Sequence, residues 1–249
     1  MKRKLFIFII TIIFIAIYWK LHPIINEFSL KFKDKKELKS NFKKSIRLNS
    51  ECKCKINKII YLTYLQNDLL QVKYSYKSDE LNINLNNTKT TCDLYNTLTH
   101  GYNQKVIGYS LYGKNKLYYN YLKDLTKLIK IMYPQWIIRI HYDDSIDQNV
   151  ICDIECQLDE NNKLYDNVVF CNTNKMLKSF YDINDNKIWS LSNIHKMMWR
   201  WLPLGDSFVD IFSSRDTDSL IIEREIDSVN VWLNSSKLGH IMRGIKYLH

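Results

Sequence analysis

The stretch VIGYSLYGKNKLYYNYLKDLTKLIKIMYPQWIIRIHYDD, residues 106–144, decides the fold that the sequence predicts. Its first six residues, Val106–Leu111, are a short apolar run followed by a Tyr-Gly pair, which indicates a buried strand and a turn. Apolar residues then recur three and four positions apart until Pro134, and this spacing predicts a helix with one buried face. Trp136–Tyr142 is a second apolar strand that ends in two aspartates. The stretch therefore reads as one strand–helix–strand unit.

The same alternation continues toward the C-terminus. Asn167–Cys171 predicts another buried strand, and Ser190–Leu202 predicts a helix that Pro203 ends. Phe208–Phe212 predicts a further strand, and Ile222–Leu233 predicts a helix with its apolar residues on one side. Strands that alternate with helices indicate an α/β fold with a mainly parallel sheet and helices on both faces. Ligands of such sheets bind beyond the carboxyl ends of the strands.

Composition and charge are those of an ordinary globular protein. The 249 residues are 46% hydrophobic and 25% charged and contain one long apolar run, which excludes a wholly disordered chain and a polytopic membrane protein. The formal charge is +10, but only seven of the 36 basic residues are arginines. Nucleic-acid readers usually need arginine forks for bases and phosphates. We therefore expect a lysine-rich solvated surface and no nucleic-acid partner, and a cytosolic nucleic-acid binder remains an alternative.

The N-terminus predicts an attachment to a membrane. Basic residues at Met1–Lys4 precede a 15-residue apolar run, Leu5–Trp19. As a helix this run spans about 22 Å, whereas a hydrocarbon core is roughly 30 Å thick, and a snorkelling Lys20 brings the segment closer to a span. No small-x-small cleavage site follows, so residues 1–21 are expected to be an uncleaved signal anchor rather than a cleaved signal peptide. Basic residues lie on both sides of the run, and charge alone leaves its orientation open.

The cysteine content bears on the compartment. The chain has an even number of cysteines: Cys52, Cys54, Cys92, Cys152, Cys156 and Cys171. Six cysteines are compatible with disulfides in an oxidising lumen, but they allow 15 complete pairings and none is assigned. Zinc is the alternative for Cys52 and Cys54, although no second cysteine pair or histidine pair completes a set of four ligands. We expect a single-pass type II membrane protein that faces the lumen of the Golgi or the ER.

The chain divides into four predicted parts. Residues 1–21 are the anchor, and residues 22–50 are a polar, lysine-rich stem without a clear apolar period. Residues 51–104 form an N-terminal extension in which stretches such as Ile59–Leu65 predict strands. Residues 105–249 form the α/β domain.

A pair of carboxylates follows the predicted strand Phe208–Phe212. Asp216 and Asp218 are separated by one residue, so both can reach one site just past the strand. Carboxylate oxygens suit Mg²⁺ or Mn²⁺, and a cation held there could bridge to a diphosphate and neutralise it as it departs. An isolated Asp-x-Asp more often belongs to a solvated turn, and the position at a strand end is what favours a metal site. Asp143 ends another strand and is expected on the same rim, in contact with a nucleotide, with a polar turn as the alternative.

Asp-x-Asp after a buried strand resembles the signature of GT-A-type glycosyltransferases, which use nucleotide-diphosphate sugars. Residues 108–113 (GYSLYG) and 133–136 (YPQW), with Arg139 and Asp143, resemble the first βαβ unit of a poorly characterised glycosyltransferase-like family. Residues 198–203 (MWRWLP) resemble the segment before its metal strand. Further matches are Ser214–Ser219, Arg224-Glu225, Trp232-Leu233 and His240–Arg243. The likeness covers about residues 105–245, and the ordered series is more specific than any one motif.

The resemblance implies a GT-A-like (Rossmann-like) fold and transfer of a sugar to a hydroxyl of a glycan, protein or lipid. It implies Mn²⁺ or Mg²⁺ at Asp216 and Asp218. The residues expected to bind the nucleotide sugar are Ser110, Tyr112, Asp143, Arg215 and Asp216. His240 and Arg243 are candidates for contact with the diphosphate or the acceptor, and a structural salt bridge is the alternative for Arg243. No catalytic base is identified, because Glu223 and Glu225 are expected to serve the start of a helix.

The sequence departs from the family's pattern after Arg243, where Gly244-Ile245-Lys246 stand in place of Asp, His and Pro. The chain ends at His249, about thirty residues past Asp218, where a GT-A domain normally has more chain for the acceptor. The domain is therefore expected to be shortened at its C-terminal end. A fragment, a shortened enzyme and a non-catalytic, membrane-anchored binding protein that keeps the fold remain open, and the last is the alternative function.

Overall fold

The computed structural model describes residues 45–65, 67–177, 180, 191 and 193–242 of the chain. The predicted signal anchor, the stem up to residue 44 and Arg243 lie outside these residues. Within the described ranges, no helix is both long enough and apolar enough to cross a membrane.

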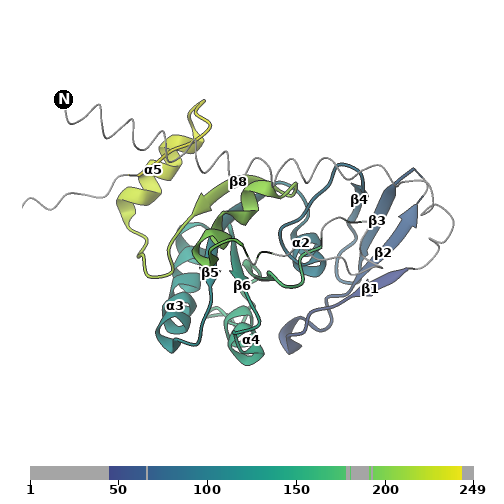
Figure 1. Ribbon diagram of the computed structural model, residues 1–249, viewed down its shortest axis with the longest axis horizontal. Helices are drawn as coiled ribbons and strands as arrows, with labels where there is room; N and C mark the ends of the chain where they lie inside the picture. The colour runs from purple at the N-terminus through teal and green to yellow at the C-terminus, as the bar shows by residue number, and fades with distance from the viewer. Residues whose placement is uncertain (1–44, 66, 178–179, 181–190, 192, 243–249) are drawn as a thin grey trace, which may run out of the picture. The chain divides into compact units, whose positions relative to one another are not determined.

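Four strands form a parallel sheet, called sheet B here. They are β5 (Gln104–Leu111), β6 (Ile137–Tyr142), β7 (Val168–Asn172) and β8 (Val209–Ser214). Their spatial order is β7-β6-β5-β8, and each neighbouring pair is parallel. Figure 1 labels β5, β6 and β8 of this sheet. β6 and β7 are buried along their whole length, which explains why the sequence shows continuous apolar runs there. The prediction of an α/β fold with a parallel sheet is confirmed.

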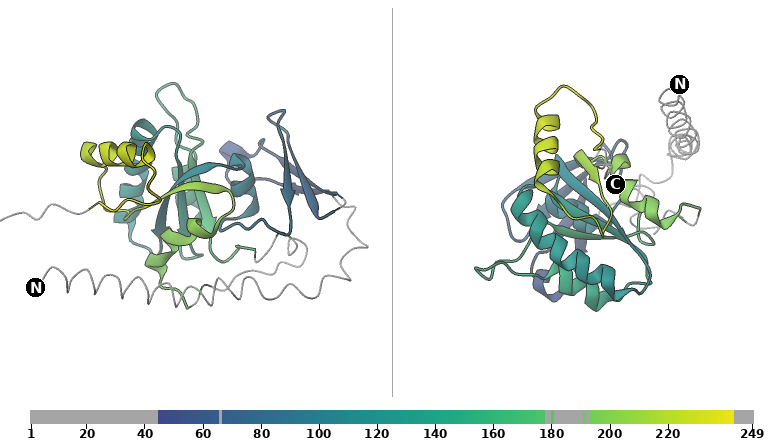
Figure 2. Two further views of the ribbon diagram at one scale, coloured as in Figure 1. Left: turned by 90° about the horizontal axis from the view of Figure 1, so that it is seen from above. Right: turned by 90° about the vertical axis from the view of Figure 1, so that its left-hand side faces the viewer.

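Three helices cover one face of sheet B. They are α3 (Lys116–Met132), α4 (Gln148–Glu155) and α5 (Glu223–Leu233). α3 begins where the Asn115 side chain accepts a hydrogen bond from the backbone N–H of Leu117. Its inward residues, such as Leu122 and Ile129, join Ile138 of β6 in one apolar cluster, against which α4 and α5 also pack (Figure 2).

The opposite face of sheet B carries Gly108, Ser110, Arg139 and His141, and η4 packs on it. The sequence predicts an α-helix here that stops before Pro203. That prediction is wrong in its type and its end, because η4 (Lys196–Gly205) is a 3₁₀ helix with the proline inside it. The backbone N–H of Arg200 donates to Ser110 Oγ in β5 at 2.8 Å. In an α-helix this N–H would donate to a carbonyl of the helix itself.

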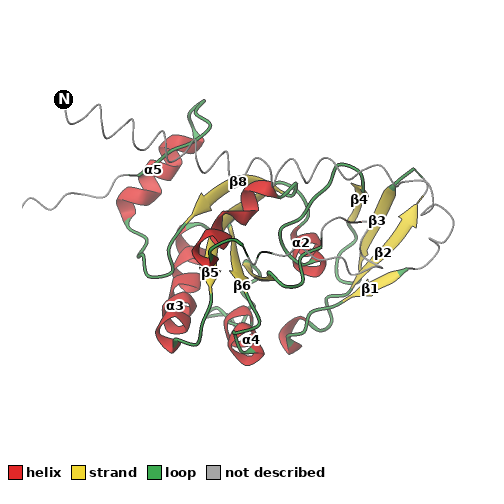
Figure 3. Ribbon diagram, in the orientation of Figure 1, coloured by secondary structure: helices red, strands yellow, loops and turns green. Residues whose placement is uncertain are grey.

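The segment before β5 forms a second, antiparallel sheet, called sheet A here. Its strands are β1 (Ile46–Leu48), β2 (Ile60–Leu65), β3 (Leu69–Tyr74) and β4 (Glu80–Asn84), in that order. The turn into β3 places Asn67 and Asp68 at positive φ, which these residue types tolerate. Helix α2 (Leu94–His100) lies between the two sheets, in contact with β2 and β7 (Figure 3).

Three disulfides join the N-terminal part of the described chain to the parts around sheet B. They are Cys52–Cys152, Cys54–Cys156 and Cys92–Cys171. All six cysteines are paired, so no thiolate remains for the zinc site considered at Cys52 and Cys54. A buried ion pair involves residues next to the second bridge, where Lys55 Nζ is 3.3 Å from Glu155 Oε2. Lys55 also donates to the carbonyl of Val168 at 3.3 Å, which fixes this segment against β7.

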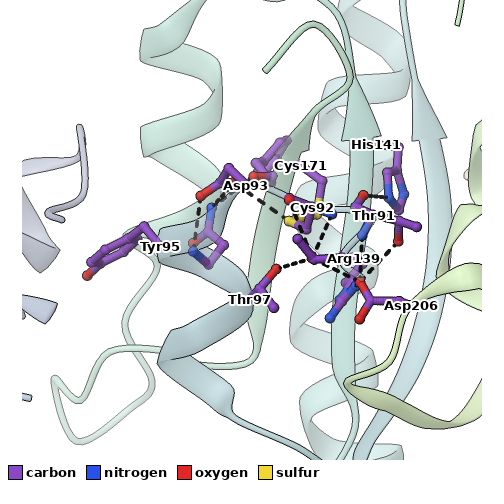
Figure 4. Close-up of a disulfide and its surroundings, with 12 residues drawn as sticks. Thr91, Cys92, Asp93, Tyr95, Thr97, Arg139, His141, Cys171 and Asp206 are labelled. Atoms are coloured by element: carbon purple, nitrogen blue, oxygen red, sulfur yellow. Dashed lines mark hydrogen bonds and ion pairs between the residues drawn. A yellow bond between two sulfur atoms is a disulfide. The ribbon is translucent and has the colours of Figure 1, made fainter. Parts of the chain in front are cut away.

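A second buried ion pair connects β6 to the segment before β8. Arg139 of β6 and Asp206, which precedes β8, lie 2.6 Å apart with side chains 1% and 0% exposed (Figure 4). Arg139 also donates to Gln104 Oε1 at 2.7 Å, and Asp206 accepts from the backbone N–H of Thr91 at 2.8 Å. Burial alone would raise the pKa of Asp206, but the Arg139 charge and these hydrogen bonds hold the pKa below its ordinary value.

Replacement of Asp206 by Asn should lower the free energy of unfolding by about 3 to 5 kcal/mol, because it leaves Arg139 buried without a counter-charge. Urea denaturation followed by circular dichroism at pH 7 measures this loss. The matched control is Glu80→Gln, which removes the half-exposed Lys73–Glu80 pair and should cost under about 1 kcal/mol. Equal losses in the two variants would contradict the role given to the buried pair.

His141 makes stability depend on pH. Its Nε2 lies 2.9 Å from the Thr91 carbonyl, and burial lowers the pKa of this imidazole to about 4. The unfolded chain therefore binds a proton between about pH 6.5 and pH 4 that the folded chain does not bind. The free energy of unfolding should fall as pH is lowered through this window, by up to about 3 kcal/mol for this group.

His141→Gln should flatten that dependence in urea titrations between pH 6.5 and pH 4. Part of the slope remains, because burial also lowers the pKa of His100, to about 3. An unchanged slope in the His141 variant would show that this group does not titrate differently in the two states.

Candidate functional site

The strand order of sheet B changes direction at β5. The chain proceeds from β5 through α3 to β6 and through α4 to β7, and it then returns to place β8 on the other side of β5. In open α/β sheets the crevice outside the carboxyl ends of the strands, at such a switch point, binds ligands. The candidate site is therefore the rim formed by the ends of β5 and β8.

Most of the site residues predicted from the sequence lie at this edge of the sheet. Asp216 and Asp218 directly follow β8, and both are exposed. Ser110 is the second-last residue of β5, and Tyr112 follows that strand with 38% of its surface exposed. Asp143 follows β6 on the same edge of the sheet, because the strands are parallel.

Helix η4 connects these strand ends. Ser110 Oγ donates to the carbonyl of Met197 at 3.3 Å, in addition to its bond with the Arg200 N–H. The Arg200 guanidinium forms an ion pair with Asp216. Lys196 Nζ lies 2.5 Å from Asp143 Oδ2. Two cations from one short helix thus reach the carboxylates that end two different strands.

The close approach of η4 to β5 depends on Gly108. A Cβ at this position would lie 2.3 Å from the carbonyl oxygen of Arg200 and 2.9 Å from the Phe212 ring. Any side chain here would push η4 away from the sheet. Gly108 therefore allows the Arg200 backbone to lie on the switch point.

The carboxylates after β6 are held in their ionised form. Burial alone would raise the pKa of Asp143, but hydrogen bonds from Lys196 and Ser145 lower it below its usual value. Hydrogen bonds from Asn172 at 2.8 Å and Asn174 at 2.7 Å lower the pKa of Asp144. Lys196 also lies over the rings of nearby aromatic residues, 6.0 Å from the Tyr112 centroid and 5.7 Å from that of Trp199.

Arg215, which the resemblance places among the nucleotide-sugar contacts, is occupied within the protein. It forms an ion pair with Glu225, and the two side chains are 10% and 11% exposed. It also donates to the carbonyls of Ser219 at 3.2 Å and Leu220 at 2.9 Å. These bonds shape the loop that carries Asp218 and join it to the first turn of α5, where Glu225 lies.

The buried surface of the switch point contains polar atoms without a hydrogen-bond partner among the described residues. They are Ser214 Oγ at the end of β8, and Trp199 Nε1 and Arg200 Nε in η4. Buried polar groups are normally paired, so each of these atoms can still form a further hydrogen bond. Among the residues that the structure describes, no group of three or more His, Cys, Asp or Glu side chains could hold a metal ion.

Of the two remaining candidates, His240 and Arg243, the structure describes only His240. His240 is exposed in the segment after α5. Arg243 lies outside the described residues. Lys196 and the ion-pair role of Arg200 are additions from the structure, and their only signal in the sequence is their place in the segment before β8. No protein-family model matches the chain, and no curated protein matches it.

Replacement of Gly108 by Ala should displace η4 and lower the free energy of unfolding by about 3 kcal/mol through overpacking. Gly205→Ala, in the same helix, is the control, because its Cβ would meet only Thr91 Cγ2 at 3.8 Å. Thermal denaturation of both variants measures the difference. A Gly108 variant as stable as the Gly205 variant would show that η4 does not need this close approach.

Proposed function

We propose that this protein binds a nucleotide-diphosphate sugar with a divalent cation at the carboxyl rim of sheet B and transfers the sugar to a hydroxyl group. One observation carries the proposal. Asp216 and Asp218 are exposed carboxylates directly after β8, at the point where the strand order changes direction. The series of motifs that resembles GT-A-type glycosyltransferases supports the same assignment, as does a parallel sheet of this order.

The donors at the rim fit Mn²⁺ or Mg²⁺ bound together with a diphosphate. A magnesium ion is commonly held by one or two carboxylates, with substrate phosphates and water completing its coordination. Asp216 and Asp218 meet that requirement. When bound, the cation would neutralise negative charge on the departing diphosphate.

Two residues around the rim are proposed to contact the nucleotide, and a third, Ser110, supports the wall of the site. Asp143, kept ionised by Lys196 and Ser145, accepts hydrogen bonds, and Tyr112 offers an exposed ring. Ser110 is already bonded to η4 through Met197 and Arg200, so its part is to fix the wall of the site. A donor held in this way has its anomeric carbon oriented for attack, which lowers the entropic part of the barrier.

The transfer itself exchanges two bonds at the anomeric carbon. The bond to the diphosphate oxygen breaks, the bond to the acceptor oxygen forms, and the acceptor loses its proton. We assign no base to that proton. His240 and Arg243, which follow α5 in the chain, are proposed for contacts with the diphosphate or the acceptor.

We further propose that residues 1–21 anchor the protein in the Golgi or ER membrane as a single-pass type II protein. The three disulfides support a lumenal location, because disulfides form and persist in oxidising compartments. The acceptor would then be a glycan, a protein or a lipid of that compartment.

A screen of UDP, GDP and CMP sugars, with and without Mn²⁺, should find one donor that stabilises the protein only with the metal. At a concentration near 100 times Kd the melting temperature should rise by roughly 5 °C. Asp218→Ala should abolish that rise. The matched control is Asp210→Asn, which changes an exposed carboxylate of β8 away from the rim and should retain it.

A rise that survives in both the Asp216 and Asp218 alanine variants would contradict the metal site. Metal-dependent binding without hydrolysis or transfer of the sugar would instead identify the non-catalytic binding protein.

A further inference from the structure

Two backbone contacts set the place of Arg200 in the site. Its N–H donates to Ser110 Oγ at 2.8 Å, and its carbonyl lies against Gly108 on β5. The Arg200 backbone is therefore held against β5, at the switch point of sheet B. From there its side chain reaches Asp216, the first carboxylate of the pair after β8.

The ion pair of Arg200 and Asp216 differs from the other arginine pairs around sheet B in its exposure. The Asp216 side chain is 51% exposed and that of Arg200 is 20% exposed. The pairs Arg139–Asp206 and Arg215–Glu225 are buried, with no side chain above 11% exposure. An exposed pair contributes little and exchanges its partners readily, whereas breaking a buried pair is costly.

The charges at the rim show what would follow if a divalent cation replaced the Arg200 guanidinium at Asp216. Two carboxylates carry two negative charges, which a divalent cation neutralises completely. Once the cation is bound, Asp216 no longer needs the guanidinium, and the diphosphate brings new negative charge to the same rim. A guanidinium binds phosphate through paired, charge-assisted hydrogen bonds. Its Nε, which is buried and without a partner among the described residues, is one of the donors available for that purpose.

We propose that Arg200 is an exchangeable placeholder for the metal ion: it pairs with Asp216 in the free protein and turns to the diphosphate when the cation binds. This inference rests on the proposed metal–diphosphate site. In this role Arg200 weakens the binding of the metal alone and strengthens the binding of the metal together with a diphosphate. The cation is then retained only when the nucleotide sugar is bound.

Isothermal titration of the full chain with Mn²⁺ alone, and of the Mn²⁺-loaded chain with inorganic pyrophosphate, tests the exchange. Arg200→Gln should bind Mn²⁺ about two- to fivefold more tightly, because the competing cation is gone. The same variant should bind pyrophosphate about tenfold more weakly, because a charge-assisted donor is lost. Opposite signs in one variant are the signature, since a merely structural role for Arg200 would weaken both.

Lys196→Gln is the matched control for charge. It removes one positive charge from the same helix, but its partner is Asp143 rather than a carboxylate of the metal pair. Its affinity for Mn²⁺ alone should therefore stay close to that of the wild type. Equal tightening in both variants would overturn the placeholder role and reduce the effect to general electrostatics.

Two further outcomes separate this inference from the proposed function. If the wild type binds Mn²⁺ with pyrophosphate but Arg200→Gln weakens both affinities, the placeholder role fails and the metal–diphosphate site stands. If the wild type binds no pyrophosphate in the presence of Mn²⁺, both the site and the placeholder role are overturned.

Discussion

The buried ion pair of Arg139 and Asp206 sets the position of β8, and the candidate site follows from that position. Arg139 lies in β6, and through Gln104 it also holds the start of β5. Asp206 precedes β8 and takes hydrogen bonds from the segment that leads to the Cys92–Cys171 disulfide. The entry to β8 is thus joined at one point to its neighbours in sheet B. Because the strands are parallel, this arrangement delivers the carboxyl end of β8, with its two aspartates, next to that of β5.

Exposure decides what each arginine in this part of the protein contributes. The guanidinium of Arg139 is fully surrounded, and its ion pair is part of the interior. Arg215 is nearly as buried, and it ties the loop after β8 to the start of α5. Arg200 alone of these three reaches an exposed carboxylate. The same side-chain chemistry therefore serves stability in two places, and in the third it is available for exchange with a ligand.

Apolar spacing predicts β5, α3 and β6 because each buries one continuous stretch or face. It does not predict α4, which spans eight residues and buries only Ile151 and Ile154 among its apolar side chains. Proline rules misjudge η4, since its backbone bonds to Ser110 rather than continuing an α-helix. The spacing of cysteines leaves their pairing open, and the structure assigns all six. The aspartate pair is predicted by its place after a strand. The partner of Asp216, Arg200, is not predicted, because its position depends on the close approach of the η4 backbone to β5 that Gly108 permits.

The most direct test of the account is the position of the metal itself. Crystals of the protein grown with Mn²⁺ and a nucleoside diphosphate, measured at the manganese absorption edge, locate the ion by its anomalous scattering. We expect one peak between Asp216 and Asp218, with the Arg200 side chain withdrawn from Asp216 and directed at the diphosphate. A bound diphosphate with no manganese at these two aspartates, or manganese held elsewhere in the chain, would contradict it.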